Sequence, residues 1–156
     1  VGEMRDLETI QLTLTLAETG HLVFGTVHTN DASQTVDRII DVFPADQQDQ
    51  IRTQFSMTLA AVISQRLIPR IGGGRVAAYE VLMGTPAVTN LIRENKVRQL
   101  RNVIATGQKD GMMVLEQHLA QLISSGVISY EDAVYASVHP EDIAGLQPQH
   151  ANGAAV

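Results

Sequence analysis

The chain has 156 residues, of which 44% are hydrophobic, with no cysteine and a formal net charge of −6. This length and composition suit one folded core with a small satellite region, and they exclude a disordered chain. Without cysteine there is no disulfide, thiolate zinc site or cysteine nucleophile. The acidic balance and the few aromatic rings argue against a nucleic-acid binder. The longest apolar runs are far shorter than the ~20 residues that a membrane-spanning helix needs.

The N-terminal part of the chain predicts two helices separated by a short strand. Asp6 is an expected N-cap for a helix that ends at Gly20. Residues 21–28 are too few for a helix and are rich in β-branched and aromatic side chains, which predicts a parallel strand buried on both faces. A second helix is expected over residues 33–43, stopped by Pro44.

The middle of the chain predicts a longer helix and then a hairpin. Asp46 is the expected cap of a helix that continues toward Arg66. Three glycines at 72–74 separate two extended runs, which is typical of a β-hairpin. Pro69 suits an edge strand.

The remainder is predicted to be helical up to residue 144. Apolar residues at helical spacing indicate four helices, which begin near Pro86, Lys96, Leu115 and Ser129. Residues 145–156 lack such a pattern and are expected to form a flexible tail.

Candidate site residues lie at the ends of extended segments. If a buried strand ran into Val1, Glu3 would stand just beyond its carboxyl end, and His28 ends the strand predicted at 21–28. Neighbouring strands are ~4.8 Å apart, so Glu3 and His28 would meet in one crevice. A carboxylate beside the donors of His28, Thr29 and Asn30 suits a site that aligns a water and senses a phosphate. Taken singly, Glu3 also fits a solvated turn and His28 a buried histidine with an internal partner.

His21 lies at the opposite end of the same predicted strand. Six residues at ~3.3 Å each would hold the rings of His21 and His28 roughly 20 Å apart. Within one subunit they therefore cannot share a metal ion, and no HExxH pair occurs.

Several motifs resemble those of the secretion-ATPase superfamily. VGEMRDLETI, residues 1–10, resembles its Walker B segment, and TGHLVFGTVHTNDA, residues 19–32, resembles its His box. SQRL and YEVL fit the same superfamily, and AVTNLIRE at 87–94 is similar to the signature of type IV pilus retraction ATPases. Assembly ATPases usually carry a four-cysteine zinc insertion where this chain has a cysteine-free glycine hairpin, which favours the retraction branch. The resemblance extends to about Ile143.

The resemblance implies an α/β fold, the C-terminal part of a RecA-like parallel-sheet ATPase domain followed by a small all-helical region. The expected division is a partial ATPase core at 1–83, a helical region at 84–144 and the tail at 145–156. The implied protein is a homo-hexameric, cytoplasmic ATPase, peripheral at the inner membrane. It would use ATP and Mg²⁺ to retract type IV pili in twitching motility, acting on the pilus platform protein of that membrane.

The resemblance also implies a role for individual residues. Glu3 would be the Walker B glutamate that orients the attacking water and supports Mg²⁺, and His28 would report the γ-phosphate. Arg5, with Thr29 and Asn30, would face the nucleotide. The residues implied to be structural or at a subunit interface are His21 and Asp6. Those implied to serve retraction rather than hydrolysis are Asn90, Leu91, Ile92, Arg93 and Glu94.

Two features depart from the family pattern. Thr89 stands where the retraction signature usually has arginine. No GxxxxGK[ST] occurs, so the phosphate cradle is missing and we expect the chain by itself to be an inactive piece of a longer ATPase.

Three other functions stay open. The first is a pilus-assembly or type II secretion ATPase of the same superfamily, and the second is a nucleic-acid-binding RecA-like protein. The third is a catalytically inert interaction module, whose docking surface would be a basic stretch at Arg93, Lys96, Arg98 and Arg101.

Overall fold

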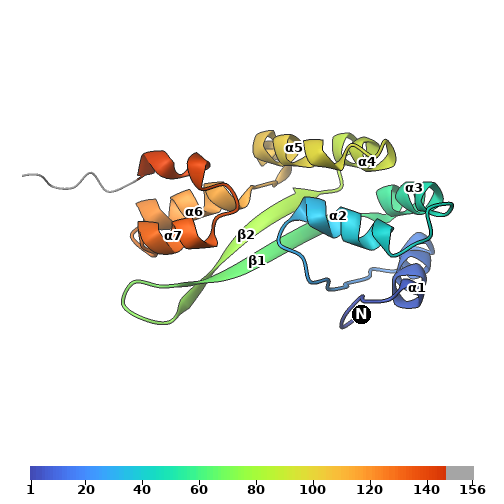
Figure 1. Ribbon diagram of the computed structural model, residues 1–156, viewed down its shortest axis with the longest axis horizontal. Coiled ribbons are helices and arrows are strands. Elements are labelled where there is room, and N and C mark those ends of the chain that lie inside the picture. The colour runs from blue at the N-terminus through green and yellow to red at the C-terminus, as the bar shows by residue number, and fades with distance from the viewer. Residues whose placement is uncertain (147–156) are drawn as a thin grey trace, which may run out of the picture. The chain divides into compact units, whose positions relative to one another are not determined.

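The computed structural model describes residues 1–146, which form two compact units. Unit 1 comprises residues 1–64 and 80–113, and unit 2 comprises residues 65–79 and the chain from 114 onward. The elements of both units are labelled in Figure 1. These units do not follow the boundary at residue 83 that the sequence suggests, because both strands of a hairpin pass from one unit into the other. The division into ATPase core and helical region stays a prediction.

Unit 1 begins with two helices that carry acidic N-caps. Helix α1, Leu7–Glu18, starts after Asp6, whose carboxylate accepts a hydrogen bond from the N–H of Thr9. This confirms Asp6 as a cap. Helix α2, Ala32–Asp41, starts after Asp31, which caps the N–H of Gln34 in the same way. Each cap satisfies one of the backbone donors that a helix start leaves unpaired.

Three further helices complete unit 1. They are α3, Gln48–Thr58, α4, Pro86–Arg93, and α5, Leu100–Thr106, with 3-10 turns η1 at Val97–Gln99 and η2 at Gln108–Asp110. Helix α3 packs against α1, α2 and α4, and α4 packs against α5. The core between them is aliphatic with two phenylalanines; it includes Ile10, Leu14, Val36, Ile40, Phe43, Phe55, Val88, Ile92 and Leu100.

The helix predicted from Asp46 toward Arg66 is wrong in its second half. Helix α3 ends at Thr58, and residues 61–69 form strand β1, Ala61–Pro69, instead. Exposed and more buried side chains alternate along β1, which is the period of a strand. A helical spacing is also present in the sequence, at Phe55, Leu59, Val62 and Ile63. Residues 61–69 are nevertheless a strand, because they pair with β2. Asp46 is not the cap; Gln47 precedes α3 without a side-chain cap.

The predicted glycine hairpin is confirmed. Strand β2, Arg75–Met83, pairs with β1 in a two-stranded sheet. Gly72, Gly73 and Gly74 all have positive φ, which a glycine adopts without a Cβ clash. The turn is closed by a hydrogen bond from the Arg70 N–H to the Gly74 carbonyl.

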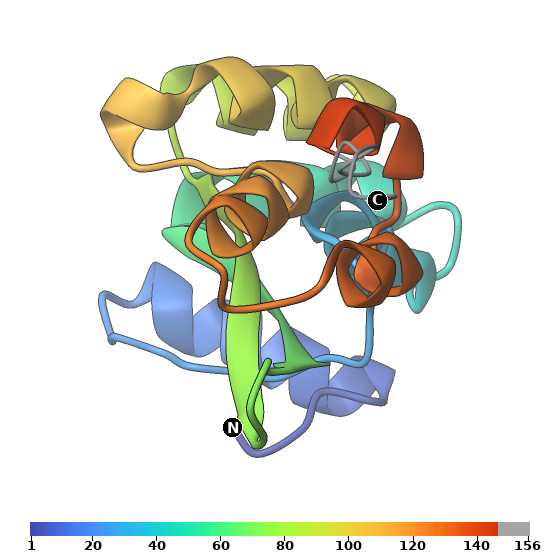
Figure 2. The ribbon, with the colours of Figure 1, turned by 90° about the vertical axis from the view of Figure 1, so that its left-hand side faces the viewer.

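The buried strand predicted at residues 21–28 is not found. This segment joins α1 to α2 as a coil (Figure 2), and Leu22 and Phe24 are 82% and 77% exposed. A strand buried on both faces needs further chain packed on both faces and hydrogen-bonded neighbours along its edges. Among residues 1–146, hydrogen bonds join residues 22–28 only to the first four residues, whereas His21 is bonded to the end of α1. Of the parallel sheet that the expected fold contains, residues 1–146 provide one pair of extended segments, at 1–4 and 24–26.

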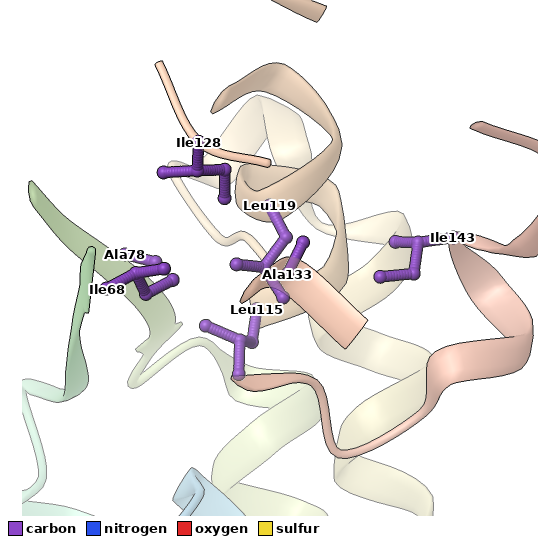
Figure 3. Close-up of a cluster of buried hydrophobic side chains, with 7 residues drawn as sticks. All are labelled: Ile68, Ala78, Leu115, Leu119, Ile128, Ala133 and Ile143. Carbon is purple, nitrogen blue, oxygen red and sulfur yellow. The ribbon is translucent and has the colours of Figure 1, made fainter. Parts of the chain in front are cut away.

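Unit 2 combines the far half of the hairpin with two helices, α6, Leu115–Ser124, and α7, Tyr130–Ala136. The 3-10 turns η3, Pro140–Asp142, and η4, Ala144–Leu146, follow. Its core unites side chains from the strands, the helices and the loops: Ile68, Ala78, Leu115, Leu119, Ile128, Ala133 and Ile143 (Figure 3). The predicted start at Ser129 is confirmed, because its hydroxyl accepts from the N–H of Asp132.

Two sequence expectations concern the chain's end and its relation to membranes. Of the predicted tail, residues 145 and 146 belong to η4, and residues 147–156 lie outside the described part of the chain. Within residues 1–146, no helix combines the length and the apolar character that crossing a bilayer requires.

Candidate active site

Two extended segments lie side by side at the N-terminus of unit 1. The amino group of Val1 donates to the carbonyl of Phe24 at 2.7 Å, and the N–H of Met4 donates to the carbonyl of Thr26 at 2.9 Å. The Thr26 hydroxyl donates to the carbonyl of Gly2. Both segments therefore run in the same direction, as adjacent parallel strands do. This arrangement places the residues that follow each segment at a common edge.

Glu3 and His28 meet at this edge. The Nε2 atom of His28 is 2.7 Å from Oε1 of Glu3, and Nε of Arg5 donates to the same carboxylate oxygen. The proximity is the one that the strand argument predicted. Glu3 is partly buried, whereas the side chains of Arg5 and His28 are largely exposed.

The charge state of Glu3 follows from these contacts. The hydrogen bond from Arg5 is the largest cause that holds the pKa of Glu3 below its ordinary value; desolvation opposes it, and the positive charge of Arg5 adds to the lowering. Glu3 is therefore an anion near neutral pH. An ionised carboxylate can accept a proton or polarise a water molecule. An imidazole N–H at the same place can donate to an anionic oxygen.

The loop after His28 is held onto the first turns of α2. The hydroxyls of Thr29 and Thr35 are 2.7 Å apart, and the N–H of Asn30 donates to Oε1 of Gln34 at 3.3 Å. Thr35 is buried. The Thr29 hydroxyl thus has a partner inside the protein, whereas Asn30 is exposed. Contacts of Thr29, Asn30 and Arg5 with a nucleotide stay a prediction.

Sequence reasoning missed Glu80, which also contacts this region. Glu80 lies on β2, is only 8% exposed, and accepts a hydrogen bond from the N–H of Ala32 at 2.7 Å. The available signal was a carboxylate between Ala78 and Leu82, at an inward position of an alternating strand. Buried carboxylates are rare unless they have partners, so this position was worth marking.

His21 lies away from Glu3 and finishes helix α1. The Nδ1 atom of His21 is 3.0 Å from the Thr19 hydroxyl and 3.3 Å from the carbonyl of Leu16. The backbone N–H of His21 donates to the same carbonyl. These contacts are local, as are those of Asp6 at the other end of α1. A role of His21 or Asp6 at a subunit interface stays a prediction.

The expected retraction motif lies on α4 and has a buried and an exposed side. Ile92 is fully buried and Leu91 partly buried, whereas Asn90, Arg93 and Glu94 are exposed. Just beyond the helix, Lys96 forms an ion pair of 2.6 Å with Glu94. This split between sides is the one expected from the sequence.

The described residues include no group of three or more His, Cys, Asp or Glu side chains placed to hold a metal ion. A cation here would have Glu3 as its carboxylate ligand and would need further ligands from elsewhere. Mg²⁺ suits such a site, because it is commonly bound by one or two carboxylates with waters and substrate phosphates.

Together, the extended pair, the carboxylate–imidazole contact and the following helix have the form of the C-terminal α/β part of an ATPase. A family model described as Type II/IV secretion system protein matches residues 1–124. The chain therefore belongs to the type II/IV secretion system protein family.

Two relatives show which members of this family the chain resembles. The chain is 56% identical over 142 residues to the Type IV pilus retractation ATPase PilT of Pseudomonas aeruginosa, covering 91% of this chain and 41% of that relative. It is also 56% identical over 134 residues to a Twitching motility protein of Neisseria gonorrhoeae, covering 85% of this chain and 36% of the relative. The chain thus spans about two fifths of these relatives' lengths.

Solved structures agree with this placement. A crystal structure of the pilus retraction motor PilT with bound ADP matches with a TM-score of 0.83 and 51% identity, covering 91% of this chain and 40% of that one. The Legionella pneumophila ATPase DotB matches with a TM-score of 0.75 at 26% identity, over 86% of this chain and 37% of that one. The expected fold class, the C-terminal α/β part of this kind of ATPase, is confirmed.

Proposed function

We propose that this chain is the C-terminal part of an ATPase motor that drives type IV pilus retraction. The observation that carries the ATPase assignment is the 2.7 Å contact between Glu3 and His28 at the edge of two parallel segments. The retraction assignment is supported by identity, which is 56% to the retraction ATPase and 30% to the assembly ATPase PilB of the same Pseudomonas strain.

In the proposed mechanism Glu3 orients the water that attacks the γ-phosphate of ATP. Its lowered pKa keeps the carboxylate ionised and able to accept a hydrogen bond from that water. His28 would exchange its Nε2 contact with Glu3 for a hydrogen bond to a phosphate oxygen, and would so respond to whether the γ-phosphate is present. Arg5 neutralises part of the charge that Glu3 brings to an anionic substrate.

Mg²⁺ would supply charge neutralisation to the phosphates when it is bound together with the nucleotide. Glu3 is the residue of this chain that fits as its ligand, since a carboxylate oxygen is the ligand type that Mg²⁺ prefers. The phosphate cradle would come from a part of the complete protein outside these residues.

The exposed apolar side chains of the 21–28 segment support a larger core in the complete protein. Leu22 and Phe24 have more than three quarters of their surface in contact with solvent. Large apolar groups in that state favour burial against further chain. Additional parallel strands beside this segment, with helices packed on the faces of the sheet, would provide it and would complete a RecA-like sheet.

The complete motor is proposed to be a homo-hexamer at the cytoplasmic side of the inner membrane. Hydrolysis between subunits would shift packed domains against one another, which is a common way to turn nucleotide chemistry into motion. The exposed side of α4, with Asn90, Arg93 and Glu94, is the proposed route by which that motion reaches the pilus platform protein.

Deleting the gene from cells that carry it distinguishes the candidate functions. Loss of a retraction motor leaves surface pili in place and stops twitching, and an ATPase-competent copy restores movement. Loss of surface pili would instead assign the chain to an assembly or secretion ATPase. If a copy without ATPase activity restores twitching fully, the chain acts as an interaction module and the proposal is wrong.

A further inference from the structure

Glu80 is a buried carboxylate that the proposed chemistry does not use. It lies on β2, and its Oε1 accepts a hydrogen bond of 2.7 Å from the backbone N–H of Ala32. Ala32 is the first residue of α2 and is fully buried. The bond therefore joins the hairpin to the beginning of α2, across 48 positions of the sequence.

The position of Glu80 is favourable for an anion. A carboxylate loses its hydration on burial and is retained where charged hydrogen bonds offset that loss. The first turn of α2 offers N–H groups that have no partner inside the helix, together with the positive end of the helix dipole. Glu80 consequently stabilises the beginning of α2, together with the Asp31 cap.

The beginning of α2 in turn fixes His28. Every residue between His28 and Ala32 is bonded to the first turns of this helix: Thr29 to Thr35, Asn30 to Gln34, and Asp31 to the N–H of Gln34. These hydrogen bonds hold residues 29–31 onto α2, directly after His28. A shift in the start of α2 is thus passed on to the contact of His28 with Glu3.

We infer that Glu80 is a positioning residue, which orients His28 toward Glu3 by anchoring the N-terminus of α2. Its carboxylate is bonded to the backbone of α2, and it acts on the site through Ala32 and the loop at 28–31. The inference rests on the proposed function only in so far as the Glu3–His28 contact serves hydrolysis.

Unit 2 offers a matched control. Glu116 is likewise buried, and its Oε1 accepts from the hydroxyl of Ser137 and from the N–H groups of Val138 and His139. It anchors a different loop in the same chemical manner. Replacing Glu116 removes a buried carboxylate of equal size from unit 2, whereas α2 belongs to unit 1.

Hydrogen exchange of the complete protein, followed by mass spectrometry, tests the anchoring directly. In Glu80→Ala we expect exchange in a peptide covering residues 28–35 to rise at least tenfold, while a peptide covering 137–143 is unchanged. Glu116→Ala should give the reverse pattern, and Glu80→Gln, which keeps an acceptor oxygen, should restore slow exchange at 28–35. Unchanged exchange at 28–35 in Glu80→Ala overturns the inference. If that variant does not fold, Glu80→Asp, whose reach is one methylene shorter, decides in the same way.

ATP turnover by the same variants tests the consequence for His28. We expect Glu80→Ala to lower kcat about tenfold with KM for ATP within twofold, Glu80→Gln to recover to within threefold of the parent, and Glu116→Ala to stay within twofold. An equal loss in Glu80→Ala and Glu116→Ala would mean a general stability effect and would contradict positioning. If the parent itself hydrolyses no ATP, the proposed function fails, while the exchange data still decide on the anchoring.

Discussion

His28 and Glu3 contact each other over 2.7 Å although 25 positions separate them in the chain. The contact follows from two parallel extended segments, which bring their following residues to one edge. His21, at the start of the second segment, is used instead to close helix α1 through Thr19 and Leu16. The two histidines thus have different structural surroundings, and this difference is testable.

Alanine substitution should separate the two histidines. In the complete protein we expect His28→Ala to reduce kcat for ATP at least tenfold, because it removes the N–H donor beside Glu3. His21→Ala should reduce it less than threefold and lower the melting temperature slightly, since only contacts at the end of α1 are lost. Steady-state turnover and thermal unfolding of both variants provide the check. Equal kinetic defects would mean that His21 acts on the site across a subunit interface.

The exposed side of α4 should couple hydrolysis to motion without taking part in hydrolysis. We expect the double variant Asn90→Ala with Arg93→Ala to keep ATP turnover within about twofold and to lose most pilus retraction. These side chains are exposed, so their removal leaves the core intact. ATPase assays combined with twitching measurements test this.

Ile92 provides the control for that experiment, because it is fully buried in the same helix. Ile92→Ala should lower the free energy of unfolding by about 2–5 kcal/mol and impair both activities through folding. If the exposed pair also abolishes hydrolysis in a folded hexamer, α4 belongs to the catalytic part, and the separation of motor from relay is wrong.

Two of the three side-chain helix caps expected from the sequence are found, and Asp46 is the one that is not. Asp6 and Ser129 are both confirmed, because a cap depends on chemistry within three residues of itself. The boundary between α3 and β1 was missed because Val62 and Ile63 fit both a helical and a strand period. Only pairing with β2 distinguishes the two, and that partner lies farther along the chain.

The candidate site shows the same division between local and distant information. The approach of Glu3 to His28 followed from a rule about parallel strands, even though the segment at 21–28 proved to be exposed coil. Glu80 was missed because its partner, Ala32, is 48 positions away and no local pattern connects them. The place of Glu80 between Ala78 and Leu82 indicates an inward side chain, but its partner becomes visible only in the folded structure.

Unit 2 should lose stability as the pH falls from 7 to 5 through His118. The Nδ1 atom of His118 accepts the N–H of Tyr79 at 2.9 Å, which only the neutral ring can do, and the rings stack. Burial holds the pKa of His118 below its ordinary value of 6.5. The unfolded chain therefore binds the proton more readily, so stability declines as the pH falls below 6.5 and levels off below the folded pKa.

Hydrogen exchange in β2 and α6, corrected for the intrinsic effect of pH, measures this decline. His118→Asn should flatten the change between pH 7 and 5, because asparagine offers an acceptor oxygen without titrating there. An unaltered pH dependence in His118→Asn would assign the decline to another group.

Gly84 should tolerate no side chain. A Cβ added there would lie 2.0 Å from the carbonyl oxygen of Leu59. The backbone N–H of Gly84 donates to the carbonyl of Ala60 at 2.8 Å. Gly84→Ala must displace the backbone at residues 59 and 60. We therefore expect the free energy of unfolding to fall by about 1–3 kcal/mol. Gly145→Ala, with nothing within 4 Å of the added atom, is the control and should be near neutral. Denaturant unfolding compares the two.

The substitution Glu3→Gln in the complete protein tests the central claim most directly. The amide keeps the shape of the carboxylate but cannot serve as its ionised form beside the water, so ATP turnover should fall by more than ~10²-fold. Nucleotide affinity, measured by titration with a fluorescent ATP analogue, should stay within a few-fold of the parent. Turnover within a few-fold of the parent would instead show that Glu3 is not the catalytic carboxylate.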